Sequence, residues 1–191
     1  MCRCLCANPR RHRRSRVTGK ILAGVLVLSA IAMGIGLWYT QIYAFYEPVS
    51  ATGSDDVQMT LLATGEPEVV LYEDFEAIDA DSSPIRYRAC FTTAMSLPLM
   101  TETYQPVEKA TPLNAPGWFD CFNAAEIGAA LQSGDALAFM GTENIAYGID
   151  RIVAVLPDGR GFAWHEINEC GKLAFDGEDL PATCPPKPEG Q

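Results

Sequence analysis

The stretch ILAGVLVLSAIAMGIGLWYTQIYAFY, residues 21–46, contains no charged side chain and decides how this chain is organised. Seven basic residues and no acidic residue precede it. All 24 acidic residues and the other seven basic residues follow it. The part after the stretch therefore carries a formal charge of 7 − 24 = −17, and 7 − 17 gives the net charge of −10.

We interpret residues 21–46 as a transmembrane helix. About 20 apolar residues cross the roughly 30 Å of hydrocarbon in a bilayer, and this stretch is longer. The basic residues before it, Lys20 among them, favour a cytoplasmic N-terminus. Aromatic residues at the other end, such as Trp38 and Tyr43, suit the opposite headgroup zone. The pattern predicts a single-pass protein of the bacterial inner membrane with its C-terminal domain in the periplasm.

A cleaved signal peptide is the alternative to an anchor. The apolar region of a signal peptide is usually ~7–15 residues long, which is shorter than this stretch. Cleavage after Ala44 would place Ile42 at position −3, where a small residue is usual. The anchor is therefore the favoured interpretation.

Residues 1–20 form a basic cytoplasmic segment in this scheme. Its C-x-C-x-C run, Cys2 to Cys6, offers thiolates to a soft metal, and its arginines offer a contact with anionic lipid. A third interpretation is that residues 1–16 are not translated, because Val17 fits an alternative bacterial start codon. An intact mass that includes residues 1–16 would exclude a start at Val17.

The rest of the chain divides into a polar linker at 47–56, one domain at 57–184 and a proline-rich tail at 185–191. Strands are predicted at 57–62, 85–91, 147–155 and 161–167, with a Pro-Asp-Gly-Arg turn between the last two. The acidic run at 73–81 is interpreted as a solvated face.

Residues 123–134 give the clearest helix prediction. Asn123 can cap it, Glu126 has the capping-box position and Gly134 can end it. Together with the strands, this predicts an α+β domain with a largely antiparallel sheet and one or two short helices.

Four cysteines lie in the predicted domain, Cys90, Cys121, Cys170 and Cys184. An even number in an oxidising compartment favours disulfides. Of the three possible connectivities we favour the sequential one, which closes the two shortest loops. Its second bond would fasten the C-terminal loop to the strand before it. Metal binding is the alternative, but C-x-x-C spacing is absent.

His165 is the only histidine outside the N-terminal segment, and it is a candidate general base or metal ligand. Its alternation with Trp164 suggests that one of the two faces the core, and we interpret His165 as a surface residue. The sequence contains no G-x-S-x-G, no S-x-x-K and no glycine-rich phosphate-binding motif. We therefore assign no catalytic residue, cofactor or metal site.

Three arginines stand out because the domain has few basic residues among its acids. Such arginines are expected to pair with carboxylates of the protein, a ligand or a partner. Trp118 could add an aromatic anchor for a protein contact. Internal ion pairs and core aromatics are the alternative. The candidate interaction or ligand residues are Arg86, Arg88, Trp118, Arg151 and His165.

Several segments resemble an uncharacterised bacterial family of small membrane-anchored proteins, a domain of unknown function. The similar segments are residues 18–24, 43–47, 79–91, 115–122 and 148–155. The resemblance covers nearly all of residues 18–185 but not residues 1–16, which favours the late start. The family implies no established activity and no catalytic residues.

We expect a non-enzymatic accessory or protein-interaction protein of the cell envelope. Its expected partners are the inner membrane and another envelope protein, with no cofactor and no nucleic acid. The alternatives are a hydrolase-type enzyme that uses His165 and a periplasmic ligand- or metal-sensing domain.

Overall fold

The computed structural model describes residues 16–53 and 55–187 of the chain. The expectations for residues 1–15, the cysteine run among them, lie outside the described residues. The chain divides into two units, residues 1–41 and residues 42–191. The first contains helix α1 (Arg16–Tyr39), which leads into a short π-helix, η1 (Thr40–Ala44).

Residues Gly19–Ala44 form an apolar helix of 26 residues, which is long enough to cross a bilayer. Between residues 21 and 37, every leucine, isoleucine and valine side chain is exposed. A helix that presents apolar side chains on all sides requires apolar surroundings. The helix is therefore compatible with a single-pass membrane anchor.

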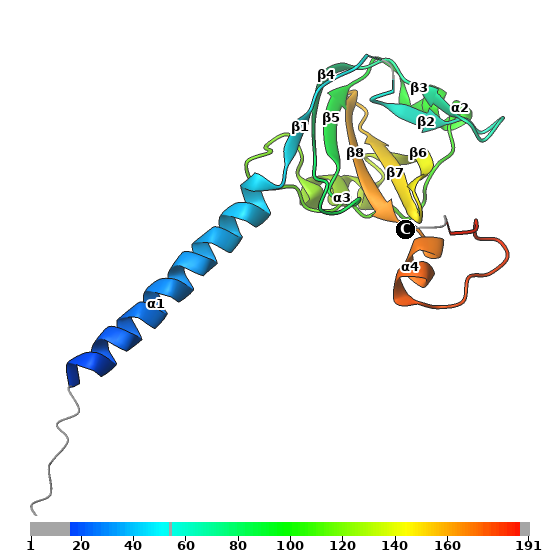
Figure 1. Ribbon diagram of the computed structural model, residues 1–191. Helices are drawn as coiled ribbons and strands as arrows, with labels where there is room; N and C mark the ends of the chain where they lie inside the picture. Colours follow the sequence, from blue (N-terminus) through cyan, green and yellow to red (C-terminus); the bar gives the residue numbers. More distant parts are fainter. Residues whose placement is uncertain (1–15, 54, 188–191) are drawn as a thin grey trace, which may run out of the picture. The chain divides into compact units, whose positions relative to one another are not determined.

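The second unit is built on a six-stranded antiparallel sheet (Figure 1). In spatial order its strands are β1 (Glu47–Val49), β4 (Glu73–Asp79), β5 (Arg88–Thr92), β8 (Arg160–Ile167), β7 (Ile149–Val155) and β6 (Leu137–Ala146). A smaller antiparallel pair consists of β2 (Gln58–Thr60) and β3 (Pro67–Val69). The described helices of this unit are, besides η1, α2 (Leu97–Thr103), α3 (Ala124–Ser133) and α4 (Glu169–Asp176). The domain is α+β, as the sequence predicts.

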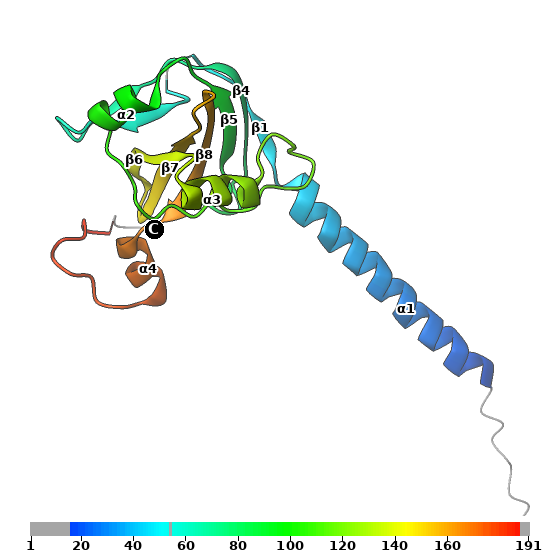
Figure 2. The same ribbon diagram turned by 180° about the vertical axis from the view of Figure 1, so that it is seen from behind.

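Each face of the six-stranded sheet packs against a separate apolar cluster. On one face, Phe91 of β5 belongs to the same cluster as Met59 of β2 and Met100 of α2. On the other face, Trp164 of β8 belongs to the cluster that contains Ile127 of α3. Helix α3 lies behind the sheet in Figure 1 and in front of it in Figure 2. Because both faces are covered, neighbouring residues of one central strand can both be buried.

Local sequence explains why α3 begins and ends where predicted. The side chain of Asn123 accepts hydrogen bonds from the backbone N–H groups of Ala125 and Glu126. Gly134 ends the helix in the left-handed conformation, with φ of +80°. The predicted turn between β7 and β8 also forms, and Gly159 there has φ of +88°.

The segment at residues 47–56 is not the linker that its polar composition suggests. Residues 47–49 form β1, which pairs with β4. Asp56 is buried and accepts hydrogen bonds from the backbone of Thr52 and Gly53 and from the hydroxyl of Tyr72. Burial alone would raise the pKa of Asp56, but these hydrogen bonds outweigh it and lower the pKa. The polar side chains belong to the domain because they find partners within it.

Two further expectations, for the acidic run and for one predicted strand, also need correction. The acidic run contains strand β4, in which Ala77 and Ile78 are buried while Glu73, Asp74 and Glu76 stay exposed. The strand predicted at residues 85–91 begins only at residue 88. In β4 the acids mask the apolar alternation, since they occupy the exposed positions.

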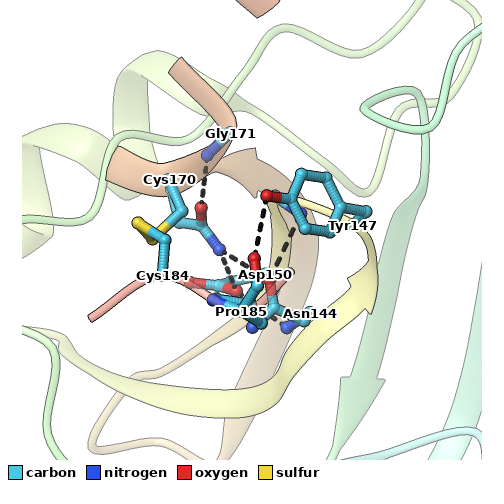
Figure 3. The surroundings of a disulfide bond; sticks show 9 residues. Asn144, Tyr147, Asp150, Cys170, Gly171, Cys184 and Pro185 are labelled. Carbon is cyan, nitrogen blue, oxygen red and sulfur yellow. Dashed lines mark hydrogen bonds between the residues drawn. A yellow bond between two sulfur atoms is a disulfide. The ribbon is translucent and has the colours of Figure 1, made fainter. Parts of the chain in front are cut away.

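The C-terminal disulfide joins Cys184 to Cys170, which lies in α4 and not in the preceding strand (Figure 3). Helix α4 packs on the turn between β6 and β7 through a contact of Gly171 with Gly148. A Cβ on Gly171 would lie 2.1 Å from the Gly148 carbonyl oxygen, so a side chain cannot fit there. Asn168 caps the helix by accepting from the Gly171 N–H at 2.8 Å. The disulfide therefore fastens the C-terminal segment to a helix that is itself closely docked.

Candidate functional site

His165 and Arg151 lie opposite each other on β8 and β7, and the ring of Tyr87 packs on both. The rings of Tyr87 and His165 are stacked with centroids 4.7 Å apart. The Arg151 guanidinium lies 4.1 Å from the Tyr87 centroid. His165 Nδ1 lies 2.6 Å from the Pro84 carbonyl oxygen, and Arg151 Nε donates to His165 Nε2 at 3.1 Å. These contacts require a neutral imidazole whose proton is on Nδ1.

The prediction that His165 is a surface residue is wrong, since it is 6% exposed. It and Trp164 are buried on opposite faces because both faces of the sheet are covered. Burial, together with the charge of Arg151, lowers the pKa of His165 to about 4. Both ring nitrogens are engaged by the protein, so neither is available to act as a general base on a substrate.

The three candidate arginines and His165 do not line a common pocket. Arg86 packs over Tyr46 and Arg88 over Phe122, two rings of the cluster on the α3 side of the sheet. Arg151 and His165 pack on Tyr87, which belongs to the cluster on the other face. The sheet therefore separates the two pairs, and the shared pocket that would support an enzyme or sensor does not form.

Arg88 is 3% exposed and binds backbone carbonyls instead of the expected carboxylate. It donates to Ile85 and Tyr87 at 2.8 and 2.6 Å, and to Leu113 and Asn114 at 2.8 and 3.1 Å. Burial lowers the pKa of this guanidinium. The side chain holds the loop at residues 113–114 against the start of β5.

Trp118 lies beside the last turn of the apolar helix Gly19–Ala44 and the residues just after it. Its indole N–H donates to the Ile42 carbonyl oxygen at 2.8 Å. Tyr43 stacks on the indole and Tyr46 meets it edge-on, each with centroids 6.2 Å away. The indole remains 36% exposed. Of the sequence candidates, Trp118 is the one that combines a defined position with an accessible surface.

A cleft of about 500 Å³, which we call the α3 cleft, lies between α3 and strands β4, β5 and β8. Buried apolar side chains, including Ile127 and Phe162, line its floor. Four exposed carboxylates also line it, from Asp74, Glu76, Asp120 and Glu126. Arg160 is the one basic residue among those lining the cleft, and it pairs with Asp158 at 2.7 Å. The cleft is thus apolar within and negatively charged around its opening.

The disulfide between Cys90 and Cys121 forms part of the wall of the α3 cleft. It joins β5 to the segment that leads into α3, and with the C-terminal bond it completes the sequential pairing favoured by loop length. The bond therefore helps to set the separation between helix and sheet on which the cleft depends.

A larger hollow of about 900 Å³ lies on the other side of α3, along residues 106–112. Alanine and proline contribute much of its lining, and Glu108 and Lys109 are its charged residues. It offers fewer convergent polar groups than the α3 cleft, which is the better candidate for that reason. Across residues 16–53 and 55–187, no three His, Cys, Asp or Glu side chains are placed to hold a metal ion.

Sequence reasoning missed the α3 cleft because its lining comes from segments far apart in the chain. In the sequence, Glu126 stands out only for its capping position, and Asp74 and Glu76 only as part of an acidic run. That run was the one local signal. It did not show that Asp120 and Glu126 lie across the same cleft.

A family model described as "Family of unknown function (DUF6446)" matches residues 57–185. The match includes both disulfides and the whole lining of the α3 cleft. No curated protein and no solved structure matches the chain.

Proposed function

We propose a binding function for this chain, which belongs to the DUF6446 family of unknown function. In this proposal it is a membrane-anchored accessory protein whose α3 cleft binds a basic segment of another envelope protein. The observation that carries the proposal is the cleft itself, in which an apolar floor and four carboxylates face one concave space.

The proposed location is the inner membrane of a bacterial envelope, with the domain in the periplasm. Helix Gly19–Ala44 supplies the anchor. The basic residues before it favour a cytoplasmic N-terminus. The two disulfides suit the oxidising side of the membrane, because thiols stay reduced in the cytosol. Anchoring would concentrate the cleft close to other membrane proteins.

A lysine or arginine side chain fits the chemistry of the α3 cleft. Its methylene stem can pack on the apolar floor while its charged end reaches the carboxylates. Ligand sites usually measure about 300–1,000 Å³, so a cleft of about 500 Å³ can hold a few such groups. The charge of −17 after the apolar stretch would also attract a basic partner over a longer range.

A sensor of small organic cations is the second candidate, because the same carboxylates would bind a polyamine. The hydrolase alternative has no comparable support, since His165 is buried and engaged at both ring nitrogens. The two binding functions differ in whether the cleft contacts a protein in native membranes.

Photo-crosslinking from the α3 cleft tests the proposal. A photoreactive amino acid at Ala130, which lines the cleft, should yield one discrete protein adduct in native membranes. The same amino acid at Glu102, an exposed position on α2, should not yield it. The double variant Glu76→Gln/Glu126→Gln should abolish the adduct, whereas Glu102→Gln should leave it unchanged.

Equal crosslinking from Ala130 and Glu102 would contradict the proposed cleft. Loss of the adduct in Glu102→Gln would contradict the charge argument. If Ala130 gives no adduct but calorimetry shows spermidine binding to the full chain, the sensor function replaces the protein-binding one.

A further inference from the structure

The loop that carries Trp118 is held firmly at both ends. Arg88 binds the carbonyl oxygens of residues 113 and 114 at its start, and Cys121 is joined to Cys90 at its end. Between them, the Phe119 N–H donates to the carbonyl of residue 116 at 2.9 Å, which closes a turn with Trp118 inside it. The fold therefore presents this indole at a fixed place.

That place is the end of the apolar helix. Ile42, whose carbonyl accepts the indole N–H, lies in the last turn of the helical segment Gly19–Ala44. Carbonyl groups at the end of a helix lack partners within it, so the indole satisfies a group that needs a donor. Around this bond, Tyr43 and Phe45 are 41% and 42% exposed. The result is a surface of accessible aromatic rings that includes Trp118, 76 residues further along the chain.

The length of the helix fixes the depth of this surface in a bilayer. At about 1.5 Å per residue, its 26 residues extend about 39 Å, which exceeds a hydrocarbon core of about 30 Å. Even at the average tilt of about 20°, a helix of this length places its ends in the headgroup layers. Ile42 is near one end, so Trp118 is held at headgroup depth.

We infer that Trp118, Tyr43 and Phe45 form a lipid-contact surface, with the indole of Trp118 seated among the phospholipid headgroups. The inference rests on the anchoring part of the proposed function. An indole suits this layer because it combines a large apolar ring with a polar N–H group. Arg86, which packs over Tyr46 at 5.4 Å, adds positive charge beside the rings. The loop is then a second attachment to the membrane, separate in sequence from the helix.

Tryptophan quenching in lipid vesicles tests the inference with the full-length chain. The protein is reconstituted into phosphatidylcholine vesicles whose acyl chains are brominated near the headgroup, or into unbrominated ones. The chain has three tryptophans, so Trp38→Phe leaves Trp118 and Trp164, and Trp38→Phe/Trp118→Phe leaves the buried Trp164. Bromination should reduce the emission of the single variant by up to roughly one half, since Trp118 is one of two remaining indoles. The emission of the double variant should fall little, because its one remaining indole, Trp164, is buried.

Two controls separate the inference from its premise. Trp118→Phe keeps Trp38, which lies within the helix and should be quenched if the helix spans the bilayer. Adding Phe175→Trp to the double variant puts an exposed indole on α4, which lies across the domain from β1 in both views (Figures 1 and 2). That indole should not be quenched.

Quenching of Trp38 without quenching of Trp118 would overturn the inference and leave the anchor in place. Absence of quenching at Trp38 would overturn the anchor and the inference together. Equal quenching at residues 118 and 175 would show that the whole domain meets lipid, and would contradict a specific role for Trp118.

Discussion

His165 is a buried base that the fold keeps neutral, so its contribution to stability depends on pH. The unfolded chain takes up this proton near pH 6.5 and the folded chain near pH 4. The contribution is complete above the unfolded pKa and is lost as the pH falls towards the folded one. Linkage predicts a fall in the free energy of unfolding of about 2 kcal/mol between about pH 7.5 and pH 5. Urea denaturation of the full chain in detergent measures this change.

The matched variant is His165→Gln, which keeps a polar side chain but does not titrate. Its free energy of unfolding should be lower at neutral pH and should vary less with pH. If the free energy of unfolding fell by the same amount in the wild type and in this variant, other groups would be responsible for the pH dependence. The account of His165 would then be wrong.

Arg88 should contribute far more to stability than an exposed arginine. Its replacement by methionine leaves the carbonyls of residues 113 and 114 without their donor, and should reduce the free energy of unfolding by about 2–4 kcal/mol. Arg160→Met, which breaks an exposed ion pair, should cost less than about 1 kcal/mol. Denaturation of both variants provides the comparison, and similar losses would contradict the role given to Arg88.

At the level of single residues, the sequence identified the unusual side chains but not their surroundings. It singled out His165 and the three arginines by their rarity in an acidic domain. It could not show that His165 is buried, because that depends on a second layer over the sheet contributed by β2 and α2. Nor could it show that Arg88 binds a loop 25 residues away.

Among the elements, α4 depends most on one close backbone contact. Gly148→Ala would place a Cβ 2.3 Å from the Gly171 Cα, in addition to the cost of a side chain at φ of +74°. Gly177→Ala is matched, because Gly177 has a similar φ of +75° with open space around it. We expect the free energy of unfolding to fall by about 1 kcal/mol in Gly177→Ala and by at least about 2 kcal/mol in Gly148→Ala. Hydrogen exchange should show loss of protection in α4 only for the second, and equal effects would contradict the docking.

The Cys90–Cys121 bond should matter for the α3 cleft as well as for stability. Replacing both cysteines with alanine removes a crosslink over 31 residues, which should cost roughly 3–4 kcal/mol. It should also weaken crosslinking from Ala130, because the helix is no longer fixed to β5. Replacing Cys170 and Cys184 instead should leave the photo-crosslinking from Ala130 unchanged. Persistence of the adduct in the first variant would separate the disulfide from the cleft.

Elements with their own start and stop signals were the predictable ones. Asn123 and Gly134 define α3 locally, and Gly159 defines the turn between β7 and β8. Strand β6 was missed because register shifts between Met140 and Ala146 interrupt its alternation. The α3 cleft could not be predicted, since it depends on how β4, β5, β8 and α3 pack together.

For the whole molecule, the separation of charge across the apolar helix predicts its orientation. Basic residues precede the helix and the acidic, disulfide-bonded domain follows it. The proposed export of the domain would account for this orientation and for the two disulfides together. In protein taken from native membranes with free thiols blocked, the four domain cysteines should become available to a second thiol reagent only after reduction. Reaction of these cysteines with the first, blocking reagent would show that they are free thiols, and would contradict an oxidising compartment.

The central claim is that the helix anchors the domain on the far side of the membrane from the cytoplasm. Protease accessibility of an epitope tag placed after Gln191 tests it most directly. In spheroplasts, added protease should remove the tag. In inverted inner-membrane vesicles, the tag should survive until detergent is added. Protection in spheroplasts with cleavage in inverted vesicles would place the domain in the cytoplasm and contradict the account.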